Sequence, residues 1–285
     1  MVIEIEQSSC IRCGKCVKVC PTNIFVQDGV KADVEIAHPQ ECIACGHCVS
    51  VCPTGSVKHS LFPAERVHAI DYQAMPAPDQ VMLLLKARRS NRTITNRPVP
   101  AEKLDMIVEA AHVAPTATNS QSVSYTLVTD PDKLVQVADY TIGVFDSVLG
   151  KLENPLLKPL LKLIMKEVYK YIPAFKQLKE DHQAGKDPIL RKATALLFIH
   201  TPLSDRFGCE NANLAYQNAS IMAQALGVSQ IYMGFVLTAI KQDRSGKLVK
   251  LLGIQGKIHA IMALGMPAFQ YDKYPDREEV KVAKL

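Results

Sequence analysis

The sequence predicts an α+β protein made of two parts of different kinds, a small N-terminal part and a larger C-terminal one. Eight of the nine cysteines lie within residues 10–52. The stretch 63–80 that follows holds three prolines among small and polar residues, which is typical of a linker. Beyond it, apolar strands and helices are interspersed without a regular strand–helix–strand count, which favours α+β over a doubly wound sheet.

The composition is that of an ordinary globular protein. The chain has 285 residues, of which 48% are hydrophobic and 21% are charged, and these values exclude general disorder and a fibrous repeat. The net charge of +5 is mild and favours an ordinary surface over one that binds nucleic acid. No apolar run approaches the roughly 18 residues of a membrane span, and MVIEIEQSSC does not resemble a secretory signal. We therefore expect a cytoplasmic protein with no membrane span and no nucleic-acid partner.

The cysteines form an internal repeat. Segments 10–22 (CIRCGKCVKVCPT) and 42–54 (CIACGHCVSVCPT) agree at 10 of 13 positions with an offset of 32 residues. Each reads Cys-x2-Cys-x2-Cys-x3-Cys-Pro, in which three thiolates of one loop bind one iron–sulfur cluster and the fourth binds the other cluster. Zinc sites use separated cysteine pairs, and disulfides are rare in the cytoplasm, so both alternatives are disfavoured.

The repeat therefore predicts two [4Fe–4S] clusters with crossed ligand sets. One set is Cys10, Cys13, Cys16 and Cys52, and the other is Cys42, Cys45, Cys48 and Cys20. Residues 1–60 resemble the bacterial dicluster ferredoxins, and this resemblance implies one-electron transfer. We expect a ferredoxin-like domain at residues 1–62, a linker at 63–80 and a second domain at 81–285.

The elements of the second domain follow from its apolar patterns. Strands are predicted at 124–130, 195–201, 230–235 and 257–265, where apolar residues run together. Helices are predicted at 81–89 with Asp79 as the cap, at 102–114 after Pro100, from Pro131 onward, at 210–226 before Gly227, and at 247–253.

A helical insertion at about 143–188 interrupts this pattern. Its central part, 149–180, is rich in Leu and Lys and is broken by Pro155, Pro159 and Pro173. A packed amphipathic hairpin that covers the core is the favoured interpretation. A lid over an active site and a membrane-surface helix remain as alternatives.

An arginine-rich segment suggests a phosphate site. Arg88, Arg89 and Arg92 surround Ser90 and Asn91, and guanidinium groups suit a terminal phosphate because each can donate two hydrogen bonds at once. There is no GxGxxG after a strand and no P-loop, which disfavours those nucleotide sites.

Residues 80–285 resemble the flavin-dependent nitroreductase family, because four motifs follow one another in the order found in that family. These motifs are RRSNRTITNRPVP, APTATNSQS, ENANLAYQNASIMAQALGVSQIYMGF and LLGIQGKIHAIMALGMP. The resemblance implies an α+β sandwich that binds FMN and forms a homodimer with its active sites at the subunit interface.

The resemblance also implies roles for individual residues. Arg88, Arg89, Ser90 and Arg92 would hold the FMN phosphate and ribityl chain, and Arg277 would close on the phosphate. Pro115, Thr116, Asn119 and Gln121 match a loop that lies against the isoalloxazine, contributed by the other subunit. Met233 and Gly234 match the backbone near the reactive flavin nitrogen. Two positions depart from the family pattern, Gln121-Ser122-Val123 and Ile94.

No residue is assigned a catalytic role, because no carboxylate pair or nucleophile–base pair stands out and the flavin supplies the chemistry in such enzymes. The isolated Cys209 is expected to be a small core residue rather than a nucleophile, and His47 a surface or cluster-tuning residue. We expect an oxidoreductase in which the clusters pass electrons to FMN, which reduces a small nitro-aromatic, quinone or activated alkene. The expected redox donor is a partner such as ferredoxin or NAD(P)H. In one alternative, NAD(P)H reduces the FMN and the clusters feed a carrier protein. In the other, the chain is a non-catalytic electron carrier or docking module.

Overall fold

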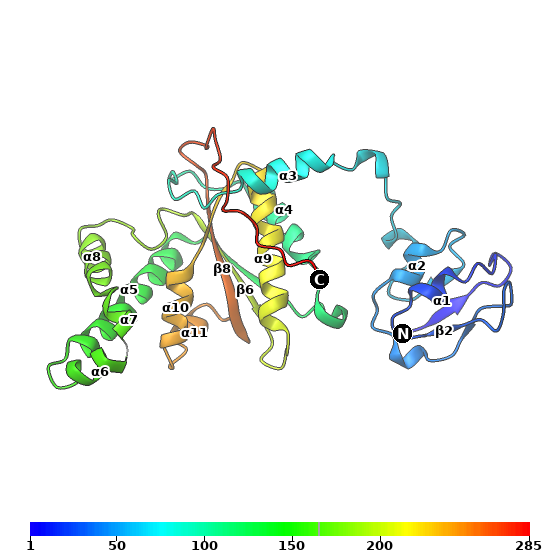
Figure 1. Cartoon of the computed structure of the whole chain (residues 1–285), viewed down its shortest axis with the longest axis horizontal. Coiled ribbons are helices and arrows are strands. Elements are labelled where there is room, and N and C mark those ends of the chain that lie inside the picture. Colours follow the sequence, from blue (N-terminus) through cyan, green and yellow to red (C-terminus); the bar gives the residue numbers. More distant parts are fainter. Residues whose placement is uncertain (165) are drawn as a thin grey trace. The chain divides into compact units, whose positions relative to one another are not determined.

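The computed structural model describes residues 1–164 and 166–285 (Figure 1). The chain divides into two compact units. Unit 1 comprises Met1–Pro76 and Thr116–Gln121, and unit 2 comprises Ala77–Pro115 and Ser122–Leu285. The mixture of helices and strands in unit 2 confirms the predicted α+β class. None of the described helices combines the length and apolar character needed to cross a bilayer.

Unit 1 has an internal near-repeat of short elements. Strand β1 (Ile3–Ile5) pairs with β4 (Val57–His59), and β2 (Phe25–Val26) pairs with β3 (Glu35–Ile36), both antiparallel. Helices α1 (Lys15–Val19) and α2 (His47–Val51) each begin after a glycine with positive φ, Gly14 at 67° and Gly46 at 73°. Glycine permits this left-handed turn between the second and third cysteines of each run. Three short 3-10 turns complete the first 76 residues, η1 (Pro39–Glu41), η2 (Ala64–Arg66) and η3 (Tyr72–Ala74).

Unit 2 is built on a four-stranded antiparallel sheet in the order β5-β6-β8-β7. The strands are β5 (Ser124–Val128), β6 (Ala195–Thr201), β7 (Ser229–Tyr232) and β8 (Lys257–Gly265), so the strands expected at 195–201 and 257–265 are confirmed. All seven residues of β6 are buried, because helices cover both faces of the sheet.

The two faces of the sheet have separate cores. On one face, helices α4 (Ala101–His112) and α9 (Gly208–Ala225) pack on Leu197 of β6 and Met262 of β8. On the other face, α5 (Pro131–Glu153), α10 (Gly234–Gln242) and α11 (Lys247–Leu251) pack on residues such as Phe198 and Ile261 (Figure 1). Alternate residues of one strand thus point into different cores, as the two-residue period of a strand requires.

Two predicted boundaries in unit 2 are wrong by three residues. Helix α3 (Pro78–Ala87) is capped by Ala77, whose amide donates to Gln80 Oε1 at 2.9 Å, and not by Asp79. Pro78 starts the helix because its fixed φ suits the first turn. The strand expected at 230–235 ends at Tyr232, and α10 begins at Gly234 because the following apolar residues bury one helical face.

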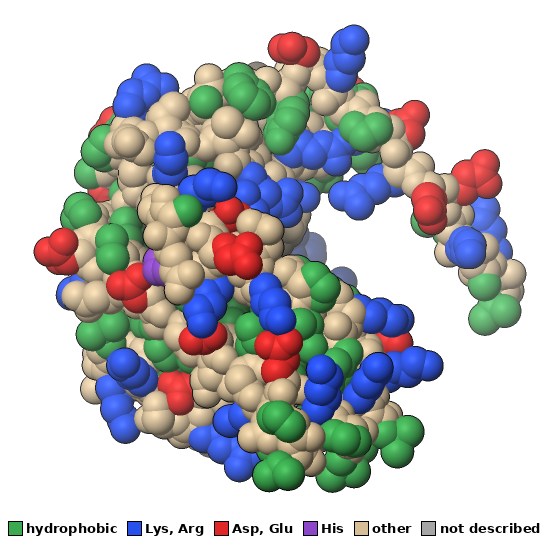
Figure 2. Space-filling view, turned by 90° about the vertical axis from the view of Figure 1, so that its left-hand side faces the viewer, with side chains coloured by type: hydrophobic (Ala, Val, Ile, Leu, Met, Phe, Trp, Pro, Cys, Tyr) green, Lys and Arg blue, Asp and Glu red, His purple; other side chains and the backbone are tan. Residues whose placement is uncertain are grey.

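The helical insertion comprises the end of α5, α6 (Lys158–Ile164), α7 (Lys166–Tyr169) and α8 (Ile172–Gln183). The packed arrangement fits α8, where Phe175 stacks on Phe145 of α5 with ring centroids 5.1 Å apart. It does not fit the segment around α6, where Leu156 and Leu163 are 89% and 81% exposed. Figure 2, which looks onto this end of unit 2, shows apolar and basic side chains next to one another along its lower edge.

Candidate functional site

The eight cysteines of unit 1 line two separate small cavities in the crossed pattern of the repeat. Cluster site 1 is the cavity lined by Cys10, Cys13, Cys16 and Cys52. Cluster site 2 is the cavity lined by Cys20, Cys42, Cys45 and Cys48. Each site takes three cysteines from one run and the fourth from the other, and all eight thiols are free. Four thiols around one cavity fit a cubane cluster.

The two buried thiols, Cys16 and Cys48, would lose their protons to a bound metal rather than to the solvent. Burial raises the pKa of Cys16, and it raises the pKa of Cys48 to about 11, with smaller contributions from neighbouring cysteines. A bound metal deprotonates such thiols outright. Among the described residues, no group of three or more His, Cys, Asp or Glu side chains is arranged around a single metal ion. A cubane spreads its ligands over four corners, so the two observations are compatible.

Polar groups near the sulfur atoms were not anticipated from the sequence. The amides of Ile24 and Ala44 donate to Cys20 Sγ and Cys42 Sγ, each at 3.3 Å. His59 Nε2 lies 3.6 Å from Cys42 Sγ. The hydroxyls of Thr22 and Thr54 lie 3.8 Å and 3.7 Å from the sulfur atoms of Cys20 and Cys52. The repeated Cys-Pro-Thr was the available signal for the two threonines, whereas His59 lies outside both runs and His47 is simply exposed.

The arginine-rich segment leaves α3 and crosses to the end of the sheet in unit 2. Arg88 is the C-cap of α3. Asn91 is buried and donates through Nδ2 to Phe269 O at 2.8 Å, and Ile94 forms a bridge with Pro267 just beyond β8. The backbone of the segment is thus fixed, while Arg88 and Arg92 form no ion pair among the described residues.

A buried glutamine supports the backbone of this segment. Gln230 on β7 is 1% exposed; its Nε2 donates to Arg89 O at 3.3 Å, and its Oε1 accepts from Tyr216 OH at 2.9 Å. Burial raises the pKa of Tyr216 strongly, which keeps its hydroxyl a donor. Sequence reasoning missed this residue, because only the fold brings β7, α9 and the arginine segment together.

The surroundings of Arg89 fit an anionic group. Arg89 and Asn91 line a small cavity together with Ser229. Ser229 Oγ is buried and has no hydrogen-bond partner among the described residues, so it is available to a ligand. Arg89 also donates to Pro275 O in the C-terminal segment at 3.4 Å. Arg277 is exposed.

Met233 and Gly234 lie at the start of α10. Met233 is buried as the N-cap, and Gly234 is exposed with open space where a Cβ would be. The first amides of a helix have no partner within the helix, so this exposed end offers N–H donors to a ligand.

The remaining predicted residues belong to different units. Pro115 ends the first part of unit 2, whereas Thr116, Asn119 and Gln121 belong to unit 1. Within unit 1, Asn119 Nδ2 donates to Ile43 O and Ala44 O at 3.0 Å and 2.8 Å, beside cluster site 2. The short turn η4 (Ala117–Asn119) contains left-handed residues without glycine. Thr116, Asn119 and Gln121 thus belong to another unit than Arg88, Arg92 and Met233.

Cys209 is not the core residue that was expected. It is exposed at the start of α9, and Asn213 Nδ2 lies 3.6 Å from its sulfur. It lies just after Gly208, where the chain passes too close to Thr201 and His259 for any side chain.

Comparison with solved structures supports the fold of unit 2. An FMN-bound nitroreductase from Bacteroides fragilis covers 72% of this chain and 99% of its own, at 19% identity and a TM-score of 0.54. An FMN-bound nitroreductase from Desulfitobacterium hafniense covers 74% and 100%, at 16% identity and a TM-score of 0.55. An FMN-dependent nitroreductase from Clostridium difficile covers 73% and 100%, at 19% identity and a TM-score of 0.53.

Sequence comparisons point the same way. A stretch of 77 residues is 34% identical to iodotyrosine deiodinase 1 of Rattus norvegicus, and it spans 26% of that protein and 27% of this chain. The model of a 4Fe-4S dicluster domain matches residues 9–56. The model of the nitroreductase family matches residues 85–266, well over half of the chain. The chain therefore belongs to the nitroreductase family and carries a 4Fe-4S dicluster domain ahead of the family's own domain.

Proposed function

We propose that the chain takes single electrons from a protein donor of the ferredoxin type and uses them to reduce a small organic acceptor. Its family makes it an FMN-dependent oxidoreductase, and its dicluster domain adds two [4Fe–4S] clusters. When bound, the clusters supply one-electron transfer, and FMN supplies two-electron chemistry. The proposed acceptor is a nitro-aromatic, a quinone or an activated alkene.

The crossed cysteine cavities carry this proposal. Two sites, each with four free thiols, lie within the Met1–Pro76 part of unit 1. A pair of clusters on the same chain as a flavin domain keeps the electron carrier at high effective concentration. An enzyme whose flavin received hydride directly from a nicotinamide would not need the clusters of unit 1.

The chain's residues would divide the work of holding FMN. Arg88, Arg89, Ser90 and Arg92 would bind its phosphate and ribityl chain, helped by the free hydroxyl of Ser229. The amides at the start of α10, after Met233, would face the ring and favour negative charge on it. Arg277 would close on the phosphate from the C-terminal segment. Pro115, Thr116, Asn119 and Gln121 would contact the ring across the interface of a homodimer.

The direction of electron flow is tested by anoxic visible spectroscopy of the purified protein. We expect reduced ferredoxin to bleach the flavin absorbance, and NADH and NADPH to do so slowly or not at all. Rapid bleaching by a nicotinamide would reverse the proposed direction and make a protein the acceptor. If the protein holds no flavin even after FMN is added, the proposed oxidoreductase function is contradicted. The alternative of a non-catalytic electron-carrier module would then take its place.

The phosphate site is tested by R88A/R92A. This double variant should lose FMN and keep its iron content, because the arginines lie in unit 2 and the cysteines in unit 1. R97A/R244A is the matched control, since both arginines are exposed in unit 2 and the change in charge is the same. Retention of flavin by R88A/R92A would contradict the assignment. In C16A, one cluster should be lost and FMN kept.

A further inference from the structure

The two cluster sites differ in the hydrogen bonds that reach their sulfur atoms from side chains. Reduction adds negative charge to a cluster, so donors to the ligand sulfurs stabilise the reduced form and raise the potential. The sites are related by the repeat, with Thr22 at the position of Thr54. The difference arises at the next polar position, where Ile24 corresponds to Ser56.

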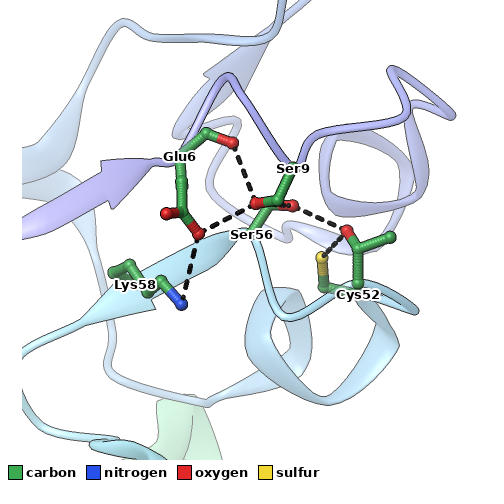
Figure 3. Close-up of polar contacts among 6 residues, drawn as sticks. Glu6, Ser9, Cys52, Ser56 and Lys58 are labelled. Atoms are coloured by element: carbon green, nitrogen blue, oxygen red, sulfur yellow. Dashed lines mark hydrogen bonds and ion pairs between the residues drawn. The ribbon is translucent and has the colours of Figure 1, made fainter.

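At cluster site 1, a chain of hydroxyls runs from the surface to the ligand Cys52 (Figure 3). Ser9 Oγ lies 2.9 Å from Glu6 Oε2 and 2.9 Å from Ser56 Oγ. Ser56 Oγ lies 2.6 Å from Thr54 Oγ1, which lies 3.7 Å from Cys52 Sγ. Glu6 is also paired with Lys58 at 3.6 Å.

The direction of every hydrogen bond in this chain follows from counting protons. A carboxylate only accepts, so Ser9 must donate its one hydroxyl proton to Glu6. Ser56 must then donate to Ser9, and Thr54 must donate to Ser56. No proton remains on Thr54 for Cys52. As a cluster ligand, Cys52 would still receive hydrogen bonds from the backbone amides of Thr54, Ser56 and Val57. It would face the lone pair of the Thr54 hydroxyl instead of its proton.

At cluster site 2, the equivalent hydroxyl is free to donate. Ile24 offers no oxygen to Thr22, and Cys20 Sγ at 3.8 Å is the one recorded partner of the Thr22 hydroxyl in the described chain. A thiolate only accepts, so Thr22 donates to it.

His59 gives cluster site 2 a second donor. Its Nδ1 accepts from the amide of Leu61 at 3.2 Å, which places the ring proton on Nε2. That Nε2 lies 3.6 Å from Cys42 Sγ. The corresponding residue of the repeat, Gln27, donates to Arg12 O and Ala32 O and not to a sulfur. With the Thr54 proton used within the chain of hydroxyls, none of the described side chains is left to donate to a sulfur of cluster site 1.

We propose that Glu6, Ser9 and Ser56 hold the Thr54 proton away from Cys52, so that the cluster at site 1 has the lower potential and the cluster at site 2 the higher one. The inference rests on the ligand sets of the proposed function. A single electron from an external one-electron reductant would then rest at site 2, whichever site it enters first. Site 2 is also the site beside Asn119, the residue proposed to meet the flavin.

The test is an anoxic redox titration of the full holoprotein with dithionite, followed by electron paramagnetic resonance. We expect two separate one-electron steps. T22V should move the upper step to more negative potential, by about 59 mV if the lost donor is worth about tenfold in the reduction equilibrium. T54V, its partner in the repeat, should produce no such negative shift in the lower step. S56A should free the Thr54 proton for Cys52 and move the lower step to more positive potential.

Three results would overturn the inference. The first is a single unresolved step, the second is a negative shift of the lower step in T54V equal to that in T22V, and the third is no positive shift in S56A. A protein without cluster signals or without eight cysteine-bound irons would instead contradict the proposed ligand sets. Iron content and the unshifted step of each variant serve as internal controls, since each substitution touches one site only.

Discussion

Replacing Gln230 by leucine tests whether the buried polar link from α9 to the arginine segment supports flavin binding. The change keeps the volume nearly constant but removes both hydrogen bonds, to Tyr216 OH and to Arg89 O. Tyr216 is 9% exposed, so its hydroxyl would be left without water. A buried donor without a partner costs about 1–3 kcal/mol. Arg89 O lies nearer the surface and adds little.

We therefore expect Q230L to lower the free energy of unfolding by about 2 kcal/mol, measured by urea denaturation of the anoxic holoprotein. FMN should also bind more weakly, because the Arg89 backbone loses its attachment to β7. Y216F alone should cost less, since Gln230 Nε2 keeps its bond to Arg89 O.

The double variant tests whether the hydrogen bond between Tyr216 and Gln230 accounts for the lost free energy of unfolding. In Y216F/Q230L, neither partner is left unpaired, so the loss should be smaller than the sum of the two single losses. Simple additivity would refute the reasoning and make the effect of Q230L one of packing alone. Unchanged FMN affinity in Q230L would show that the hydrogen bonds of Gln230 do not support phosphate binding.

Three further predictions concern other parts of the chain. G265A would set a Cβ against Ile94 Cγ2 and open the β-bridge between Ile94 and Pro267, so thermal unfolding should begin at a lower temperature and release FMN. G150A is the control, because a Cβ at Gly150 meets no other atom. Equal effects of the two substitutions would contradict the prediction. Burial holds the pKa of His200 below its usual 6.5, so as the pH drops through 6.5 the unfolded chain takes up the proton first and the free energy of unfolding falls. H200Q should make the free energy of unfolding, measured by denaturation across that range, depend less on pH. Some dependence should remain, because the pKa values of His59 and His259 are lowered too. Anoxic removal of iron should expose residues 1–62 to hydrogen exchange while β6 and β8 stay protected. The reason is that the core of unit 1 has seven buried residues, and two of them are the cysteines Cys16 and Cys48. Equal protection before and after iron removal would show that unit 1 folds without its clusters.

The features that could be predicted from the sequence are those whose signal lies within a few consecutive residues. Iron–sulfur ligands follow a fixed local spacing, and the crossed sets appear as two cysteine-lined cavities. Strands β6 and β8 are continuous apolar runs because both of their faces are buried. The end of β7 was missed because Met233 and Gly234 continue an apolar run, and only the packing of Val236 and Leu237 makes the following residues a helix.

The features that could not be predicted depend on which way a side chain turns. Nothing local to Gln230 or His59 distinguishes them from surface residues, yet the fold buries one and places the other beside Cys42. The same holds for the 116–121 loop, whose motif indicated a flavin contact but gave no sign that Asn119 would bind the backbone of the second cysteine run.

A repeat fixes which residues bind the metal, and its imperfections fix how the two halves differ. The positions proposed to coordinate iron agree between the runs, while the positions just outside them, Ile24 against Ser56 and Gln27 against His59, do not. Two equal clusters would give an electron no preferred place to rest. Because a hydrogen bond to sulfur changes a potential without changing a ligand, divergence outside the runs can set a direction of electron flow while the coordination of both clusters stays intact. On this proposal, the sequence differences that distinguish the two clusters lie outside the cysteine spacing itself.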